Sequence, residues 1–169
     1  MEYDNSEEAL NSKIEFVLAF IESIVSSKGL TGEQQTLVDR CTKNIFEEYQ
    51  LHGYQEQYAP DFLKFYKELE KQPEQEAKNL ALVIERYVLG GMDIFSKKTN
   101  IEIKNQFISF DISELPRSIQ TTGYLVILEH VMNRLKRNKN LGKHTWIFID
   151  EFHILLANQY SADYIARIF

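Results

Sequence analysis

The stretch Thr145-Trp146-Ile147-Phe148-Ile149-Asp150-Glu151-Phe152-His153 decides the fold that we expect. Bulky apolar residues run without interruption from Trp146 to Ile149 and stop at two adjacent carboxylates. A short apolar run of this kind is typical of a strand that is buried on both faces, as in a parallel sheet. The stretch therefore predicts a parallel strand with Asp150 and Glu151 at its carboxyl end, the edge where open α/β sheets bind ligands.

Two adjacent acids at the end of a buried strand are typical of the Walker B site of nucleotide hydrolases. In such sites the first carboxylate holds Mg²⁺, usually through water, and the second polarises the attacking water. Asp150 would then be the metal residue, binding Mg²⁺ through water, and Glu151 the catalytic residue. Two other interpretations stay open. One is a core strand followed by a helix-capping acid, and the other is a metal site built from Asp150, Glu151 and His153, for which no further His/Cys cluster lies nearby.

The sequence predicts no cofactor-binding residues, because it contains no Walker A loop of the form G-x-x-x-x-G-K-[S/T]. Gly142-Lys143 is the only Gly-Lys pair, and Arg137 and His144 stand where the loop needs its first glycine and its hydroxyl residue. The acid pair therefore looks like half of an ATPase site. We expect no ATP or Mg²⁺ to be bound by this chain alone.

The composition is that of a soluble globular protein, with 44% apolar and 26% charged residues in a chain of 169. That length suits one domain, or a helical lobe with part of another. No apolar run is long enough for a membrane helix, and residues 1–10 are acidic where a signal peptide would be basic and then apolar. We therefore expect a cytoplasmic protein. Its single cysteine, Cys41, excludes an internal disulfide and is expected to be a small core residue.

Charge is divided unevenly along the chain. Residues 1–76 contain 16 acids and 7 Lys/Arg, whereas residues 77–169 contain 9 acids and 12 Lys/Arg. Most of the basic excess lies in residues 134–143, around an expected helix end. A solvated helix terminus that favours cations is the simpler explanation of this run, and contact with DNA is possible but unproven.

Apolar residues at helical spacing predict a helical lobe over residues 10–92. We expect a first helix over residues 10–27 and a second from a capping box at Thr31 and Gln34 toward Gly53. A short third helix opens at Pro60-Asp61, and a fourth runs from Pro73 to Gly90-Gly91.

The pattern changes after residue 100. Residues 107–112 are expected to form a strand, residues 119–137 a long helix, and residues 146–149 the second strand, with a further helix starting near residue 161. The fold class that follows is α/β but mostly helical: a helical insertion lobe plus a partial P-loop NTPase parallel sheet made from a β-α-β unit. Because two strands are not stable alone, we expect self-association or partial disorder around residues 105–169.

Several segments in order resemble the C-terminal ATPase domain of the large conjugative-transfer ATPases of type IV secretion systems. These P-loop motors are of the kind named TraC/TraE, and the likeness is to those of Gram-positive mobile elements in particular. The segments are Leu37-Val38-Asp39-Arg40-Cys41, Tyr87-Val88-Leu89-Gly90-Gly91-Met92-Asp93-Ile94-Phe95, Thr99-Asn100-Ile101, Phe110-Asp111-Ile112-Ser113-Glu114-Leu115 and Ile149-Asp150-Glu151-Phe152-His153-Ile154-Leu155-Leu156.

The resemblance implies that residues 1–169 are a fragment of such an ATPase domain, with residues 10–92 as its helical insertion and residues 100–169 as part of a RecA-like core. It implies ATP and Mg²⁺ as cofactors of the complete enzyme, with Asp150 as the magnesium-associated acid and Glu151 as the base. It also implies a homo-oligomer that works with other subunits of the secretion apparatus, in the cytoplasm at the inner face of the cell membrane, with membrane association only through those partners. His153 matches a family position to which we assign no role.

Two alternatives stay open. Asp150-Glu151-Phe152-His153 also spells the D-E-x-H box of helicases, whose carboxylate chemistry is the same. The chain could instead be a non-enzymatic helical binding or structural module in which the two carboxylates only cap a helix. In that case both side chains should be buried in salt bridges, whereas a catalytic pair should lie open to solvent.

Overall fold

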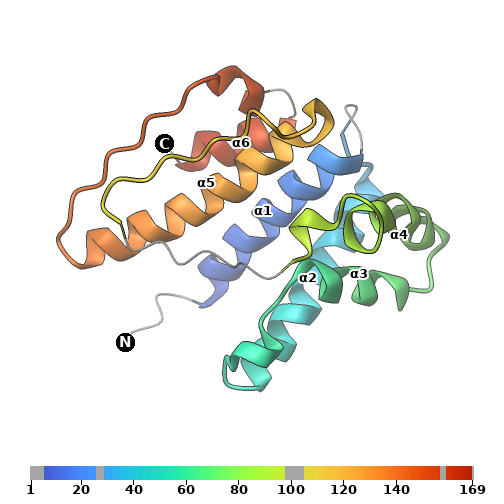
Figure 1. Cartoon of the computed structure of the whole chain (residues 1–169). Helices are drawn as coiled ribbons and strands as arrows, with labels where there is room; N and C mark the ends of the chain where they lie inside the picture. Colours follow the sequence, from blue (N-terminus) through green and yellow to red (C-terminus); the bar gives the residue numbers. More distant parts are fainter. Residues whose placement is uncertain (1–5, 26–28, 98–104, 157–158, 169) are drawn as a thin grey trace.

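The structure is a computed structural model that describes residues 6–25, 29–97, 105–156 and 159–168 (Figure 1). The described residues form six α-helices and three short 3₁₀ segments, and no strand is found among them. The 3₁₀ segments are Glu56–Tyr58, Asp93–Phe95 and Phe152–Leu156. The segment Thr99-Asn100-Ile101, which contributes to the family resemblance, lies outside the described residues.

The first group of helices confirms the helices predicted for the N-terminal half. It consists of α1 (Ser6–Val25), α2 (Gly32–Leu51), α3 (Phe62–Glu70) and α4 (Gln75–Val88), in agreement with a helical lobe. Apolar stripes at helical spacing meet in one core, which explains why periodicity located these helices. The fully buried side chains of that core include those of Ile21, Val38, Leu69, Leu80 and Ile84.

The predicted capping box at the start of α2 is confirmed. The Thr31 hydroxyl accepts from the Gln34 amide at 3.2 Å, and the Gln34 side chain accepts from the Thr31 amide at 3.1 Å. Gln34 also donates to Glu76 at 2.7 Å, so the same residue links the start of α2 to α4. Two otherwise unpaired backbone donors are thereby satisfied.

Replacing Thr31 by alanine is expected to lower the free energy of unfolding by about 1 kcal/mol, the usual effect of losing a side-chain N-cap. Chemical denaturation followed by circular dichroism measures the change. Thr36→Ala is the matched control, since the exposed Thr36 hydroxyl only bonds back to the Gly32 carbonyl at 2.9 Å. A loss at Thr36 equal to that at Thr31 would contradict the capping role.

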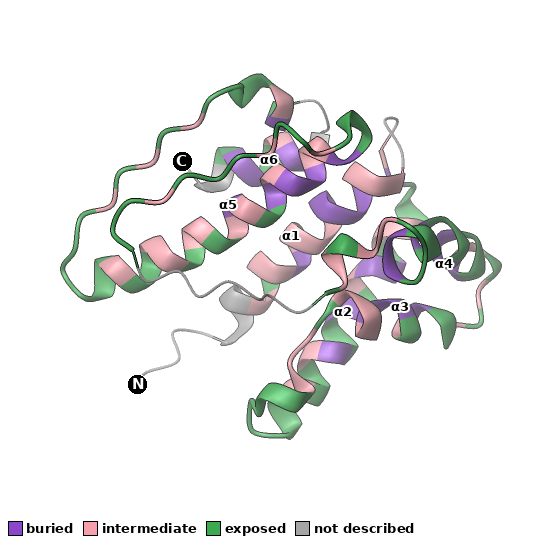
Figure 2. Cartoon of the chain, in the orientation of Figure 1, coloured by how far each residue is buried: buried purple, intermediate pink, exposed green. Residues whose placement is uncertain are grey.

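The second group of helices packs on the other side of α1. It contains α5 (Arg117–Asn140) and α6 (Gln159–Ile168), both predicted as helices, together with the 3₁₀ segment Phe152–Leu156. Leu125, Leu128 and Leu155 form a second core with Ala19 of α1 and with residues of α6. Helix α1 therefore lies between the two groups and contributes side chains to both cores (Figures 1 and 2).

The prediction of an α/β fold with a partial parallel sheet is wrong for the described residues. Residues 107–112 and 146–149, predicted as strands, are extended but form no ladder with each other or with another described residue. The apolar run was expected to be buried on both faces, yet Trp146 is 85% and Phe148 90% exposed. Ile147 and Ile149 are half-buried, and Ile149 packs against the second core. Only one face of the run meets α5 and its neighbours, so the residues that a sheet would cover remain in solvent.

Three hydrogen bonds hold the two extended segments against α5. Arg134 donates to the Asn105 carbonyl at 2.7 Å, and Asn138 donates to the Thr145 hydroxyl at 2.9 Å. Tyr124, more than three turns earlier on α5, donates through its hydroxyl to the Asp150 carbonyl at 3.2 Å. Residues 145–150 thus run back along α5, from near its C-terminus to near its N-terminus. Asp150 and Glu151 reach the N-terminal part of α5 without a sheet to support them.

Candidate active site at the acidic pair

The two predicted site residues are exposed and adjacent, in the turn between the extended segment and the 3₁₀ segment Phe152–Leu156. The Glu151 side chain is 59% exposed, and its carboxylate lies 3.6 Å from Nε2 of His153, whose side chain is itself 78% exposed. The Asp150 carboxylate accepts from the backbone amide of Glu151 at 2.9 Å. No Lys or Arg of the described residues forms a salt bridge with either acid. Both carboxylates are therefore exposed to solvent, and neither forms a buried ion pair with a described residue.

Glu151 has a left-handed backbone conformation, with φ of 54°. A residue with a β-carbon pays roughly 1–2 kcal/mol to adopt this region, which favours glycine. The conformation turns the chain sharply after Asp150, and the Ile154 amide then donates to the Glu151 carbonyl at 2.9 Å. Glu151 therefore occupies a backbone conformation that by itself would favour glycine.

Tyr124 of α5 is a neighbour of the acidic pair that the sequence alone did not reveal. Burial raises the pKa of its phenol, and the nearby negative charges of Glu151 and Asp150 raise it further. The phenol therefore stays protonated and donates to the Asp150 carbonyl. A polar-tipped aromatic residue within an otherwise aliphatic stripe was the available signal, since a half-buried tyrosine hydroxyl usually has a partner.

The Gly142-Lys143 pair has a structural role that accounts for its presence without a phosphate loop. The Lys143 amide donates to the Asn138 carbonyl at 2.8 Å, and the Gly142 amide donates to the Lys139 carbonyl at 2.9 Å. With Gly142 at φ of 68°, this is the Schellman arrangement that ends helices. Gly142 therefore terminates α5 and directs the chain into the extended segment.

The interpretation of Asp150, Glu151 and His153 as a zinc-type site gains no support. No group of three or more His, Cys, Asp or Glu side chains is arranged to hold a metal within the residues that the structure describes. The two exposed carboxylates are hard oxygen ligands, which suits Mg²⁺ that keeps most of its water. They fit the role of an outer-sphere site that needs further ligands from a nucleotide.

The single cysteine lies in an unreactive environment. Cys41 is fully buried in the first core, and burial raises the pKa of its thiol to about 12, so it is not poised as a nucleophile.

The basic run is on the last turns of α5 and just beyond, where Lys136, Arg137, Lys139 and Lys143 are exposed. Cations at a helix C-terminus interact favourably with its carbonyl ends.

A partly buried charge cluster, which sequence reasoning missed, joins α1, α5 and α6. Glu129 of α5 forms an ion pair with Lys13 of α1, accepts from the Tyr164 hydroxyl of α6, and accepts from Asn133 at 3.1 Å. The cluster borders a small cavity of about 170 Å³. The available signal was the position of Glu129 directly after Leu128 on the buried side of the helix, where an unpaired acid would be costly.

Among the described residues, no helix combines the length and apolar character that crossing a membrane requires. Searches of known protein families, curated proteins and solved structures give no match to this chain.

Proposed function

We propose that this chain is part of an ATPase that powers conjugative DNA transfer or type IV secretion, and that it contributes the acidic pair of the nucleotide site. The observation that carries the proposal is that Asp150 and Glu151 stand open to solvent, side by side at the end of the apolar segment. A structural pair would be expected in buried salt bridges. The order of the resembling segments along the chain supports the same family.

In this proposal Asp150 would hold Mg²⁺ through water, and Glu151 would accept a proton from the attacking water. Mg²⁺ bound with ATP would neutralise charge on the transferred phosphoryl group. Tyr124 is a positioning residue, because its hydroxyl holds the Asp150 carbonyl at 3.2 Å and so fixes the backbone that presents the two carboxylates. The phosphate-binding loop belongs to another part of the complete enzyme, which acts as a homo-oligomer at the inner face of the cell membrane.

The test is Mg²⁺-dependent ATP hydrolysis by the complete polypeptide encoded by the reading frame that contains this chain. Glu151→Gln is expected to lower the turnover rate about 10²–10⁴-fold, the usual contribution of a general base, with little change in ATP binding. Glu114→Gln, at an exposed acid in the turn before α5, is the matched control and is expected to retain full turnover. Residues 1–169 alone are expected to show no turnover.

Unchanged hydrolysis by Glu151→Gln in the complete polypeptide would remove Glu151 from the mechanism. Hydrolysis by residues 1–169 alone that is lost in Glu151→Gln would instead contradict the expectation that a separate phosphate loop is needed. If the complete polypeptide neither binds nor hydrolyses ATP, the acidic pair has a non-enzymatic role.

A further inference from the structure

The extended segment after α5, residues 144–149, combines backbone groups that lack backbone partners among the described residues with side chains whose exposure alternates. No backbone-to-backbone hydrogen bond joins residues 144–149 to another described residue, so their amides and carbonyls have no backbone partner in the described part of the chain. Exposure alternates along the segment, with half-buried Thr145, Ile147 and Ile149 on one side. Trp146 and Phe148 stand on the other side, 85% and 90% exposed. This is the period of a β-strand with one face on α5 and a bare aromatic face toward solvent.

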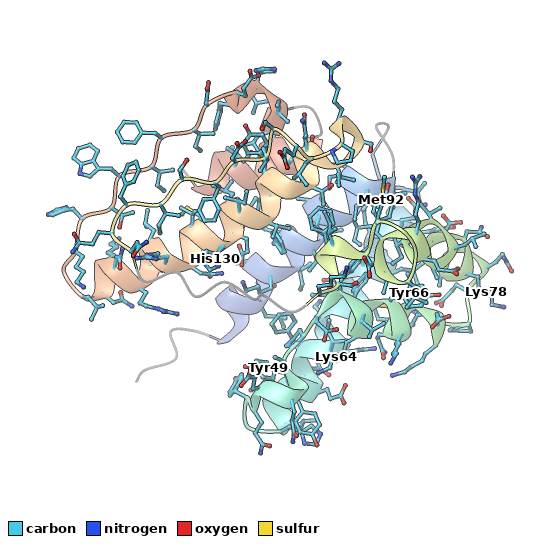
Figure 3. All side chains as sticks on the ribbon, in the orientation of Figure 1. Tyr49, Lys64, Tyr66, Lys78, Met92 and His130 are labelled. Carbon is cyan, nitrogen blue, oxygen red and sulfur yellow. The ribbon has the colours of Figure 1, made fainter. Side chains whose placement is uncertain are left out.

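Figure 3 shows some side chains of this segment pointing away from the helices, in agreement with the alternating exposure. A typical aromatic side chain buries about 150–250 Å² when it is covered. Two such residues on one short strand form an apolar patch comparable with the largest found on ordinary monomers. A patch of this size beside unpaired backbone groups is suited to an added strand.

The charges of the segment indicate which strand would fit. Lys143 and His144 precede the apolar residues, and Asp150 and Glu151 follow them. The segment thus has a basic end and an acidic end of equal length around an uncharged centre. A second copy placed antiparallel brings each basic end against an acidic end.

We propose that two copies of this chain pair through residues 144–150 as antiparallel strands about a two-fold axis at Ile147. In this register Trp146 of each copy lies opposite Phe148 of the other, on the exposed face. His144 lies opposite Asp150. Lys143, in the cap of α5, and Glu151, in the turn, flank the paired residues at the same ends of the two strands. Both copies use the same patch, which is the arrangement of a closed two-fold dimer.

The Trp146–Phe148 and His144–Asp150 pairs of this register are favourable. Directly opposed side chains in antiparallel strands have β-carbons about 4.5–5.5 Å apart, where aromatic pairs and opposite charges stabilise. A shift of one residue would place the aromatic side chains of one copy opposite half-buried residues of the other and would move His144 away from Asp150. The buried area is below that of a standard interface, so the association is expected to be weak and to depend on concentration.

The proposal is independent of the proposed ATPase role, because it rests on the backbone, the aromatic pair and the charge order. Dimerisation nevertheless affects whether the acidic pair can serve a nucleotide site. In the dimer the acidic pair of each copy is covered by Lys143 and His144 of the other, so dimerisation and use of the acids by a nucleotide site would be mutually exclusive.

The first measurement uses Trp146, the only tryptophan of the chain. Sedimentation velocity and tryptophan emission are recorded on residues 1–169 from roughly 1 μM to roughly 1 mM, which spans weak affinities. We expect a monomer with a solvent-exposed emission spectrum at low concentration. We expect a dimer with a blue-shifted spectrum at high concentration, with both transitions at the same midpoint.

The second measurement is a charge swap that tests the register. Lys143→Glu places like charges beside each other at both ends of the paired strands and is expected to weaken association about tenfold or more. Lys143→Glu combined with Glu151→Lys restores opposite charges and is expected to restore association. Lys139→Glu, at an exposed basic residue outside the paired segment, is the matched control and is expected to have little effect. Circular dichroism confirms that each variant retains its helices.

A monomer throughout the concentration range overturns the proposal, as does a blue-shifted emission that does not depend on concentration. A dimer that survives Lys143→Glu, or that the double swap does not restore, overturns the antiparallel register. Loss of ATP hydrolysis in the complete polypeptide bears on the proposed function alone, because none of these measurements involves a nucleotide.

Discussion

Replacing Leu80 by alanine is expected to lower the free energy of unfolding by about 2–5 kcal/mol, the range for a leucine lost from a packed core. Leu80 lies on α4 with 1% of its surface exposed, among the residues of the first core. Its removal leaves a cavity between helices that are held together mainly by apolar contact. Urea denaturation followed by circular dichroism measures the loss.

Leu82→Ala is a close control, because it makes the same substitution two residues away on the same helix. Leu82 is 72% exposed, so its replacement is expected to change the free energy of unfolding by no more than about 0.5 kcal/mol. Similar losses of stability for Leu80→Ala and Leu82→Ala would mean that α4 does not bury Leu80 and expose Leu82.

Replacing Glu129 by glutamine is expected to reduce stability by about 1–2 kcal/mol at pH 7, because it removes a largely buried ion pair. The Glu129 side chain is 15% exposed and that of Lys13 is 33% exposed, so solvent screens part of the attraction. Glutamine retains most of the shape and leaves an acceptor for the Tyr164 hydroxyl. The expected loss therefore comes mainly from the charge.

The effect of pH on this pair has a definite sign. Burial alone would raise the pKa of Glu129, but attraction to Lys13 and hydrogen bonds from Lys13, Tyr164 and Asn133 outweigh it and hold the pKa below its ordinary value of 4.5. A carboxyl with a depressed pKa stabilises the folded state above its unfolded value, and that stabilisation is lost as pH falls through the folded value. The difference between wild type and Glu129→Gln should therefore shrink below pH 4.5.

Denaturation curves at several pH values between 7 and 3 provide the measurement. Glu114→Gln is the control, since Glu114 is exposed in the turn before α5 and its replacement is expected to leave the curves unchanged. A difference between wild type and Glu129→Gln that stays constant as the solution is acidified would exclude a charged Glu129 as its source.

Helices could be predicted from the sequence because their signals are local. Apolar spacing, the box at Thr31 and Gln34, and the glycines near helix ends all act within a few residues. The extent of burial along these helices could not be predicted in the same way: Val83 is an apolar residue of α4, yet it is 44% exposed. Periodicity locates a stripe, but it does not determine how much of that stripe the neighbouring helices cover.

Strands could not be predicted in the same way, because a strand needs a partner that local sequence does not specify. The run from Trp146 to Ile149 has the composition of a buried strand, yet it lies against α5 with one face in solvent. The position of the acidic pair was read directly from the sequence, whereas Tyr124, 26 residues earlier, is its neighbour only in three dimensions. The link between Lys13 and Glu129 spans 116 residues and was beyond any local pattern.

The position of α1 determines which parts of the chain can exist by themselves. Phe16 packs against both cores, while Ile21 belongs to the first and Ala19 to the second. A polypeptide cut between the two helix groups, near residue 97, would leave α5 and α6 without the helix on which they rest. Exchanging or deleting one group as a module would therefore expose the apolar surface of the other. The two groups are expected to fold only together.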